Sequence, residues 1–443
     1  MHSSIEALAA EIERLPVIRR LGKVVAVRGG LISLSGLSDF ARLGDELSVN
    51  GGGAEVVGFE QDLILALPFG SAEGIAVGQE VELIGPFRLR PDLRWMRRVL
   101  NARGEPLDGG FLVNGSGALP LQASPPPPSI RRALGQRLET GFDVLNTALP
   151  LVRGQRIGIF AGSGVGKSSL LGHLARNIEA DIVVCALIGE RGREVSEFIR
   201  DGLGDGGLAR SVVIASSSDE SPMQKRQAAW TAMTVAEWLR DQGKQVVLLF
   251  DSLTRFAEAH REVALQAGEP PSLRAYPPST ARLISALCER AGTGVGGQGD
   301  ITAIFTVLVA GSDMNEPVAD MARGVLDGHV VLDRAIAERG RFPAIDLRRS
   351  VSRSLPNAAT TEENRMIADL RRVIAAYEEV APMIRSGLYA AGSDPVIDRA
   401  ITLWPELDSF VGNRAADGIA GSYTRLRQIL SSEAGEDQPG HGA

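Results

Sequence analysis

A run of glycines and small residues near the middle of the chain has the composition and spacing of a phosphate-binding loop. It reads Ala161-Gly162-Ser163-Gly164-Val165-Gly166-Lys167-Ser168 and is followed by Ser169. Such glycines let backbone N–H groups turn inward onto phosphate oxygens, and a helix after the loop adds its positive N-terminal end. In this pattern the lysine reaches the β- and γ-phosphates and the serine hydroxyl binds Mg²⁺. We therefore expect the run to bind a nucleoside triphosphate, with Lys167 at the reacting phosphate and Ser168 on the metal.

A second signal is a single carboxylate at the end of an apolar run. Residues 245–250 have the pattern of a buried strand, and Asp251 follows them directly. Ligands of open α/β sheets lie outside the carboxyl ends of the strands, so Asp251 is placed to hold Mg²⁺ or its water. The alternative is an Asp that only caps the next helix. Because a phosphate loop precedes it, we expect the metal role.

A carboxylate and an arginine follow another strand pattern, at 181–188. They are Glu190 and Arg191 in the run Gly189-Glu190-Arg191-Gly192-Arg193-Glu194. At the same sheet edge, Glu190 can orient and polarise an attacking water, and Arg191 can meet the charge of the γ-phosphate. The alternative is a salt-bridge cluster on the surface, which would be favoured if the first two motifs were missing.

These residues converge only if strands and helices alternate along the chain. Strand patterns occur at 156–160, 181–188, 211–215, 245–250 and 301–309, and helical patterns at 167–177, 195–203, 222–241 and 280–290. Alternating units of this kind specify a mainly parallel sheet covered by helices, with the carboxyl ends of its strands at one edge. The expected fold class is therefore α/β with a P-loop core.

Three other regions surround this core. Short β-rich runs between 22 and 87, separated by Gly turns, predict a small closed β-barrel. A Pro-rich run at 124–129 must be extended and can serve as a strap across a surface. Helical patterns follow residue 346.

The expected parts, in chain order, are an N-terminal amphipathic helix at 1–21, the barrel at 22–90, the P-loop core at 91–345, a C-terminal helical domain at 346–430 and a disordered tail at 431–443. The apolar face of the first helix can pack either against a partner protein or against its own domain.

Composition excludes several classes of protein. The 443 residues carry a net charge of −7 and the pI is near 5.5, which argues against bulk nucleic-acid binding. The apolar stretch 301–311 is far shorter than the roughly 20 residues of a membrane-spanning helix. The first residues include Glu6, Glu11 and Glu13 instead of the basic start of a secretory signal, so we expect a cytoplasmic protein. Cys185 and Cys288 lie in apolar segments and predict neither a disulfide framework nor a metal site.

Seven motifs in a fixed order resemble those of the ATPases of bacterial type III protein export, which are relatives of the α and β subunits of F-type ATP synthase. Besides the phosphate loop they are Glu139-Thr140-Gly141, Ile188 to Glu194, Asp251-Ser252-Leu253-Thr254-Arg255, Tyr276-Pro277-Pro278-Ser279, Asp327-Gly328-His329 and Ser350-Val351-Ser352-Arg353. The resemblance covers roughly residues 22–430. The flagellum-specific form is favoured by the loop sequence ending in Lys167-Ser168-Ser169.

The resemblance implies a RecA-like core that binds ATP and Mg²⁺, assembled as a ring of six identical chains with sites between neighbours. Glu190 matches the catalytic β-type pattern, whereas non-catalytic α subunits have Gln there. Arg353 matches the arginine that an α-type subunit sends into its neighbour's site. Phe342 matches an aromatic that stacks on adenine, where Tyr is usual, although a core Phe before a turn is the alternative. A second adenine-facing aromatic is not evident, and Tyr389 is only a guess.

The same resemblance implies partners and a location. The partners are a stator-like regulator, a central stalk-like export protein, a membrane protein of the export gate, and chaperone–cargo complexes, with no nucleic acid. The location is the cytoplasm, at the inner-membrane export apparatus. The alternatives are an injectisome ATPase, a Rho-like RNA translocase and a non-hydrolysing subunit. The barrel region is not basic, and its aromatics are Phe40, Phe59, Phe69 and Phe87, which argues against an RNA translocase that stacks bases on aromatic side chains. Glu190 argues against a non-hydrolysing subunit.

Overall fold

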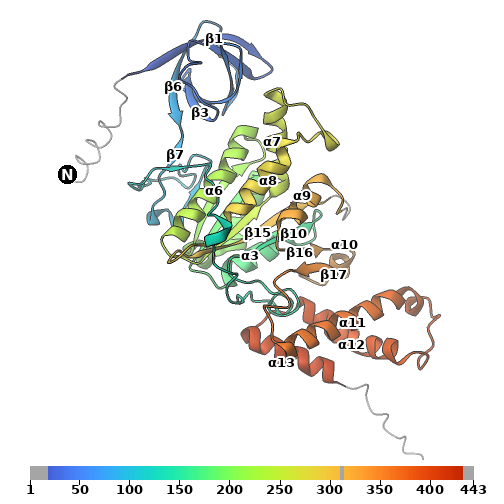
Figure 1. The fold of residues 1–443 in the computed structure, drawn as a ribbon. Helices are drawn as coiled ribbons and strands as arrows, with labels where there is room; N and C mark the ends of the chain where they lie inside the picture. The colour runs from blue at the N-terminus through green and yellow to red at the C-terminus, as the bar shows by residue number, and fades with distance from the viewer. Residues whose placement is uncertain (1–17, 310–313, 433–443) are drawn as a thin grey trace, which may run out of the picture.

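The computed structural model describes residues 18–309 and 314–432, in three successive parts (Figure 1). A β-barrel lies at one end, an α/β core in the middle and a group of helices at the other end. The helix expected at 1–21 falls almost entirely outside the described residues, and β1 already begins at Arg20. Most of the tail expected at 431–443 lies outside them too. Within the described ranges, no helix is long and apolar enough to cross a membrane.

Six antiparallel strands close into the expected barrel, in the order β1-β2-β5-β4-β3-β6. Alternate residues point inward, so Ile32 and Leu34 of β2 are buried in the barrel core while their neighbours are partly exposed. Arg226 of the core domain donates to Glu55 Oε1 at 2.6 Å and joins the barrel to the core. The strands are β1 (Arg20–Arg28), β2 (Leu31–Ser35), β3 (Asp45–Val49), β4 (Gly52–Glu60), β5 (Leu63–Pro68) and β6 (Glu80–Pro86).

The central sheet has the order β17-β16-β10-β15-β13-β11-β12-β8, with β14 paired to β15. Its main strands are parallel, and β17 is an antiparallel edge strand beside β16. In the register Leu187 lies opposite Asp251, the last residue of β13, so β11 runs past the end of β13 to Glu190. The strands are β8 (Val99–Leu100), β10 (Arg156–Ala161), β11 (Ile182–Glu190), β12 (Ser211–Ser217), β13 (Val246–Asp251), β14 (Gly292–Thr293), β15 (Asp300–Leu308), β16 (Gly328–Leu332) and β17 (Ile345–Ser352). A short ribbon pairs β7 (Arg88–Leu89) with β9 (Leu119–Pro120).

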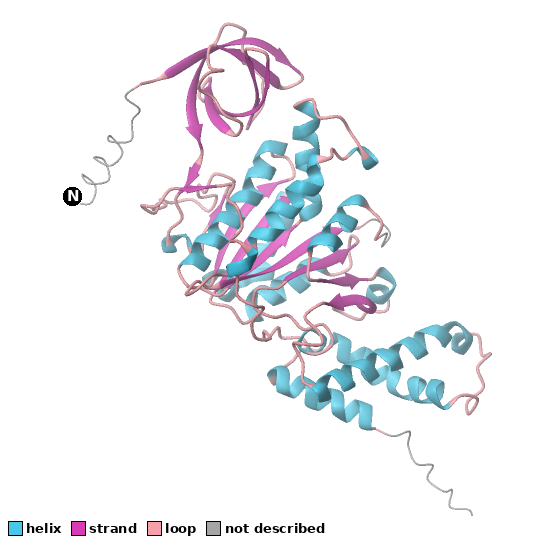
Figure 2. Cartoon of the chain, viewed as in Figure 1, coloured by secondary structure: helices cyan, strands magenta, loops and turns pink. Residues whose placement is uncertain are grey.

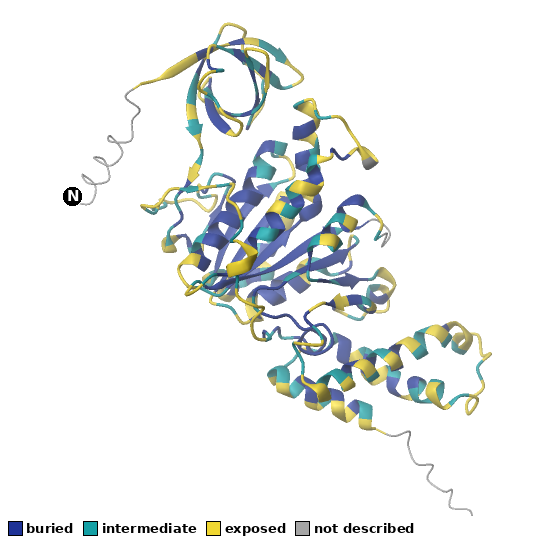
Figure 3. Ribbon diagram, in the orientation of Figure 1, coloured by how far each residue is buried: buried dark blue, intermediate teal, exposed yellow. Residues whose placement is uncertain are grey.

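Helices cover both faces of this sheet (Figure 2). Alternate residues of β11 enter two different cores: Val183 and Cys185 pack with α3, and Val184 and Ala186 pack with α6. Period-two burial on both faces explains why the strand reads as a continuous apolar run, and Figure 3 shows the sheet buried throughout its centre. The core helices are α2 (Asp143–Asn146), α3 (Lys167–Asn177), α4 (Gly192–Glu197), the π-helical turn Phe198–Leu203, α5 (Gly204–Ala209), α6 (Pro222–Asp241), α7 (Leu253–Gln266), α8 (Ser279–Arg290), α9 (Pro317–Val325) and α10 (Arg334–Glu338).

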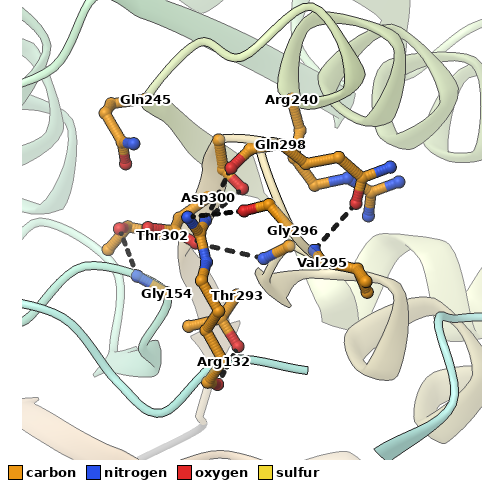
Figure 4. Close-up of polar contacts among 12 residues, drawn as sticks. Arg132, Gly154, Arg240, Gln245, Thr293, Val295, Gly296, Gln298, Asp300 and Thr302 are labelled. Atoms are coloured by element: carbon orange, nitrogen blue, oxygen red, sulfur yellow. Dashed lines mark hydrogen bonds and ion pairs between the residues drawn. The ribbon is translucent and has the colours of Figure 1, made fainter. Parts of the chain in front are cut away.

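That the Pro-rich segment 124–129 serves as a strap stays a prediction, and the residues after it are fastened to the β14–β15 hairpin (Figure 4). Arg132 donates to Asp300 Oδ1 at 2.6 Å and to the Gln298 carbonyl at 2.7 Å, while Thr293 Oγ1 donates to the Arg132 carbonyl. One turn of 3₁₀ helix at Pro128–Ile130 interrupts the extended chain. These bonds hold the chain at Arg132 at the end of the sheet opposite the phosphate loop, because β15 starts at Asp300 and runs parallel to β10.

Three helices form the C-terminal part: α11 (Thr361–Arg385), α12 (Pro395–Gly412) and α13 (Gly418–Ser431). Thr360 begins α11 with a capping box, in which its side chain and that of Glu363 bond each other's backbone N–H. The sheet continues past the expected boundary at residue 346, since β17 pairs with β16 up to Ser352. We therefore propose that the core extends to Ser352 and that the helical domain begins with α11. The remaining boundaries stay predictions.

Candidate nucleotide site

The phosphate loop connects β10 to α3, which is the context that the sequence predicts. Gly166 precedes the helix with φ +90°, a left-handed conformation that favours glycine, and a Cβ there would lie 3.1 Å from the Phe342 ring. The loop borders a cleft of about 650 Å³, which is lined by Gly162, Ser163, Gly164, Gly166, Lys167, Ser168 and Ser169. Val165 is the exception, because its side chain is buried in the core below the loop. Any role of Val165 in phosphate binding therefore falls to its backbone N–H.

The three chemically active groups predicted from separate motifs meet beside this cleft, where Lys167 and Glu190 line it and Asp251 lies buried next to them. Lys167 Nζ lies 2.5 Å from Asp251 Oδ1 and 3.2 Å from Glu190 Oε1. Asp251 also accepts a 2.6 Å hydrogen bond from Thr306 Oγ1 on the neighbouring strand β15. The side chains of Lys167, Glu190 and Asp251 are 12%, 15% and 6% exposed. A cation thus sits between two carboxylates at the carboxyl edge of the sheet, where nucleotide ligands bind in open α/β folds.

Burial and charge shift the protonation of this cluster. Burial raises the pKa of Glu190, the negative charge of Asp251 raises it further, and Lys167 opposes them, with the result that the pKa lies at about 7. Burial by itself lowers the pKa of Lys167, but the charges of Asp251 and Glu190 outweigh it and raise that pKa above its ordinary value. Lys167 is therefore cationic at neutral pH, while Glu190 is poised to gain or lose a proton. A carboxylate with a pKa near the working pH suits general-base chemistry.

Arg191 lies at the mouth of the cleft rather than inside the cluster. Its side chain is 80% exposed and pairs with Glu194 Oε1 at 3.0 Å. The same edge carries Arg255, which pairs with Glu258 at 2.8 Å. Arg255 approaches Gly189 so closely that a Cβ there would lie 3.1 Å from its side chain. A contact of Arg191 with the γ-phosphate stays a prediction.

A second hollow, of about 620 Å³, adjoins the phosphate loop and shares Gly166, Ser168 and Ser169 with the first cleft. The exposed ring of Phe342 and the rings of Phe142 and His173 line it. Tyr389 does not: its hydroxyl donates to Asp398 Oδ1 at 3.0 Å near the start of α12. Tyr389 is therefore no second adenine contact within its own chain, and the guess itself stays untested. Stacking of adenine on Phe342 remains a prediction, for which the hollow provides space beside the loop.

Arg353 lies outside both hollows of its own chain. It follows β17, and its guanidinium donates to the backbone carbonyls of Leu326 at 3.0 Å and Arg323 at 3.3 Å. Its side chain therefore has no place in the cluster of Lys167, Asp251 and Glu190. This position is compatible with a role in a neighbouring chain.

Three residues of the site were not predicted from the sequence. Thr306 lies inside an apolar strand pattern, where only pairing of β15 next to β13 reveals its contact with Asp251. Phe142 follows the Glu139-Thr140-Gly141 motif, and His173 lies on the apolar face of α3. The motif beside Phe142 was the one signal that could have identified this part of the hollow.

Comparison with known proteins identifies the families of the core and of the C-terminal part. Residues 141–352 match the nucleotide-binding domain of the ATP synthase alpha/beta family, and residues 359–419 match the C-terminal domain of the type III secretion ATPase EscN. The flagellum-specific ATP synthase of Caulobacter vibrioides is 44% identical over 443 residues, which cover 97% of this chain and 100% of that protein.

Two solved structures of EscN, from the type III secretion system of enteropathogenic E. coli, have the same fold. The assembled ATPase has a TM-score of 0.87 and 37% identity, and covers 93% of this chain and 100% of that chain. The assembled ATPase in complex with its central stalk EscO has a TM-score of 0.84, with the same identity and coverage. By its family matches, its identity to these relatives and its fold, the chain belongs to the type III secretion ATPases, which share their nucleotide-binding domain with the ATP synthase α/β family.

Proposed function

We propose that this ATPase uses Mg²⁺-dependent hydrolysis of ATP to energise flagellar type III protein export. The observation that carries the proposal is the meeting of Lys167, Asp251 and Glu190 beside the phosphate loop. ATP is the substrate of the family. Release or delivery of cargo is the work to which we assign its hydrolysis, because the 44% identical relative from Caulobacter is flagellum-specific.

The donor set fits Mg²⁺. The Ser168 hydroxyl is exposed beside the loop, and the Asp251 carboxylate faces Lys167; both are the hard oxygen donors that Mg²⁺ prefers. Within residues 18–309 and 314–432 no group of three or more His, Cys, Asp or Glu forms a metal cluster. That suits an ion held by one or two protein oxygens together with phosphate and water. When bound, Mg²⁺ supplies neutralisation of the charge that develops on the phosphate oxygens.

The protein groups then have separate tasks. Lys167, which pairs with Asp251 and Glu190, would exchange these contacts for phosphate oxygens. Glu190 would be released from that ion pair and would orient the attacking water and accept its proton. Phe342 would hold the adenine at the adjoining hollow. Arg191 at the mouth of the cleft would add positive charge near the γ-phosphate.

We also propose a homohexamer in which Arg353 completes the neighbour's site. EscN, at 37% identity, was solved as an assembled ATPase and in complex with its central stalk, which supports a ring and a central stalk-like partner for this chain. The further partners that we propose are the stator-like regulator, the export gate and chaperone–cargo complexes. The assembly would work in the cytoplasm at the inner-membrane export apparatus.

The metal assignment predicts that Thr306→Val raises the Mg²⁺ concentration for half-maximal activity by about 10- to 100-fold, the usual cost of removing a hydrogen-bond partner of a metal ligand. Valine keeps the shape of threonine but removes the hydroxyl that donates to Asp251 Oδ1. The measurement is phosphate release during a Mg²⁺ titration after treatment with EDTA. Thr302→Val is the matched control, since Thr302 lies on the same strand and bonds Gly154 instead. An unchanged Mg²⁺ requirement for Thr306→Val would contradict the assignment of Asp251 as a ligand of the metal.

The export assignment predicts that a chromosomal Lys167→Ala allele stops the appearance of flagellar proteins in the culture supernatant. Lys167 is needed for hydrolysis, so the variant protein would be present but unable to drive export. Immunoblots of cells and supernatant provide the measurement, and Lys23→Ala, on the exposed side of the barrel, is the control. If flagellar export continues while secretion by an injectisome stops, the injectisome reading is correct.

A further inference from the structure

The guanidinium of Arg353 is held by backbone carbonyls, and no carboxylate among the described residues pairs with it. Arg353 Nη1 and Nη2 donate to the carbonyls of Leu326 and Arg323, which end helix α9. The Arg353 backbone N–H donates to the carbonyl of Asp327 at 3.0 Å. The position of Arg353 therefore depends on a short stretch of chain, residues 323–328, that we call the α9–β16 turn.

The α9–β16 turn lies tightly against the backbone of Arg353. Gly328 has φ +145°, and a Cβ on it would lie 2.5 Å from the Val351 carbonyl oxygen and 3.3 Å from Arg353 N. Such distances leave no space for a side chain, so the two backbones are in direct contact. A displacement of the turn would have to displace Arg353 with it.

One ion pair fixes the turn to the sheet. Asp327 Oδ2 accepts from Arg156 Nε at 3.1 Å and from the Arg156 backbone N–H at 3.0 Å, and Oδ1 accepts from Arg156 Nη2 at 3.1 Å. In return the Asp327 N–H donates to the Arg156 carbonyl at 2.7 Å. Arg156 also pairs with Glu289 at 2.6 Å. Burial lowers the pKa of Arg156, but Asp327 and then Glu289 outweigh it and raise the pKa above its ordinary value, so the pair is ionised.

We propose that Asp327, held by Arg156, is a positioning residue for Arg353 in the reaction of the neighbouring chain. The inference rests on the proposed function of Arg353 in trans. It adds the residues that fix the position of the Arg353 guanidinium. Asp327 lines neither hollow of its own chain. Its carboxylate acts through the α9–β16 turn, whose carbonyls hold the guanidinium. A bidentate pair gives the fixed geometry that this requires.

The test is Asp327→Asn, which replaces one acceptor oxygen by an NH₂ group facing the N–H donors of Arg156. We expect kcat to fall by up to about 10²-fold, the effect of displacing a catalytic group by roughly 1 Å, with KM for ATP little changed. Arg156→Lys is a second variant with the same expected result, because lysine keeps the charge but lacks the planar fork. Glu289→Gln is the matched control, as it removes the other partner of Arg156 and should keep the parental rate.

Mixed rings distinguish a misplaced Arg353 from damage to the cleft of the variant chain. Asp327→Asn subunits have an intact cleft, and Lys167→Ala subunits have an intact Arg353, so activity should reappear where the two meet. Damage to the cleft of the Asp327→Asn chain would not be rescued. A parental rate for Asp327→Asn alone, or mixed rings that stay inactive after co-assembly is verified, overturns the inference. If Arg353→Ala alone keeps the parental rate, the proposed trans function fails instead, which is a distinct result.

Discussion

Glu190→Gln is expected to lower kcat for ATP hydrolysis by about 10²- to 10⁴-fold, the range that general-base catalysis contributes, with little change in KM. Glutamine keeps the size of the side chain and can still bond Lys167, but it cannot accept a proton from water. Nucleotide binding should persist because Lys167, Ser168 and Asp251 are untouched. Single-turnover phosphate release and equilibrium binding of a nucleotide measure the two effects separately.

The pH dependence of the reaction provides an independent test of Glu190. Its pKa of about 7 means that the group is protonated, and unable to act as a base, at lower pH. Since kcat/KM reports the free enzyme, its logarithm should rise with pH and level off above about 7. Glu190→Gln should lose this dependence. The control is Glu378→Gln in α11, where burial also raises the pKa but the carboxylate is remote from the cleft. A parental rate for Glu190→Gln would exclude the assignment.

Stability distinguishes a chemical defect from an unfolded protein. The folded-state pKa of Glu190 is raised from its ordinary value of 4.5, so its contribution to stability is complete below 4.5 and is lost as pH rises through about 7. Glutamine stays neutral and avoids this loss. At pH 8 the Tm of Glu190→Gln should therefore equal or exceed that of the parent. A slow enzyme with such a Tm has lost chemistry and not structure.

Much of the fold was predictable because local patterns and tertiary packing agree. The strands of the barrel and helices α3 and α6 carry their own signals, such as Pro222 at the start of α6 after the Ser221 cap. Helix α7 was missed although its first residues belong to a quoted motif. Strand β17 was missed because Asp346, Arg348 and Arg349 give it a polar character, which only its place at the edge of the sheet explains.

The candidate site was predictable where its residues form a continuous motif or directly end an apolar strand. The phosphate loop is continuous, and Asp251 and Glu190 each end an apolar strand. Thr306 could not be identified, since an isolated threonine in a buried strand has no signal until β15 is placed beside β13. The hollow beside Phe342 combines segments that are distant in sequence. Its lining therefore depends on how α3 and the C-terminal helices meet.

Arg353→Ala is expected to lower kcat by about 10³- to 10⁵-fold, the contribution of an arginine finger, which corresponds to about 4 to 7 kcal/mol of activation free energy. The γ-phosphoryl group spreads negative charge over its oxygens in the transition state, and a guanidinium can neutralise it. Arg353 lies outside the cleft of its own chain, so its charge would reach a nucleotide only across a subunit contact. Activity of the parent should then rise more than proportionally with protein concentration. Arg353→Lys should not rescue the loss, because a point charge lacks the planar fork.

The decisive measurement mixes two inactive proteins. Arg353→Ala subunits retain Lys167, Asp251 and Glu190, whereas Lys167→Ala subunits retain Arg353. In mixed rings some contacts pair an intact cleft with an intact arginine, so phosphate release should reappear, while each protein alone stays inactive. Two different affinity tags, purified in sequence, verify co-assembly. Mixed rings that form but remain inactive would show that Arg353 does not act in trans, because every group required for hydrolysis would then be present at a shared contact without effect.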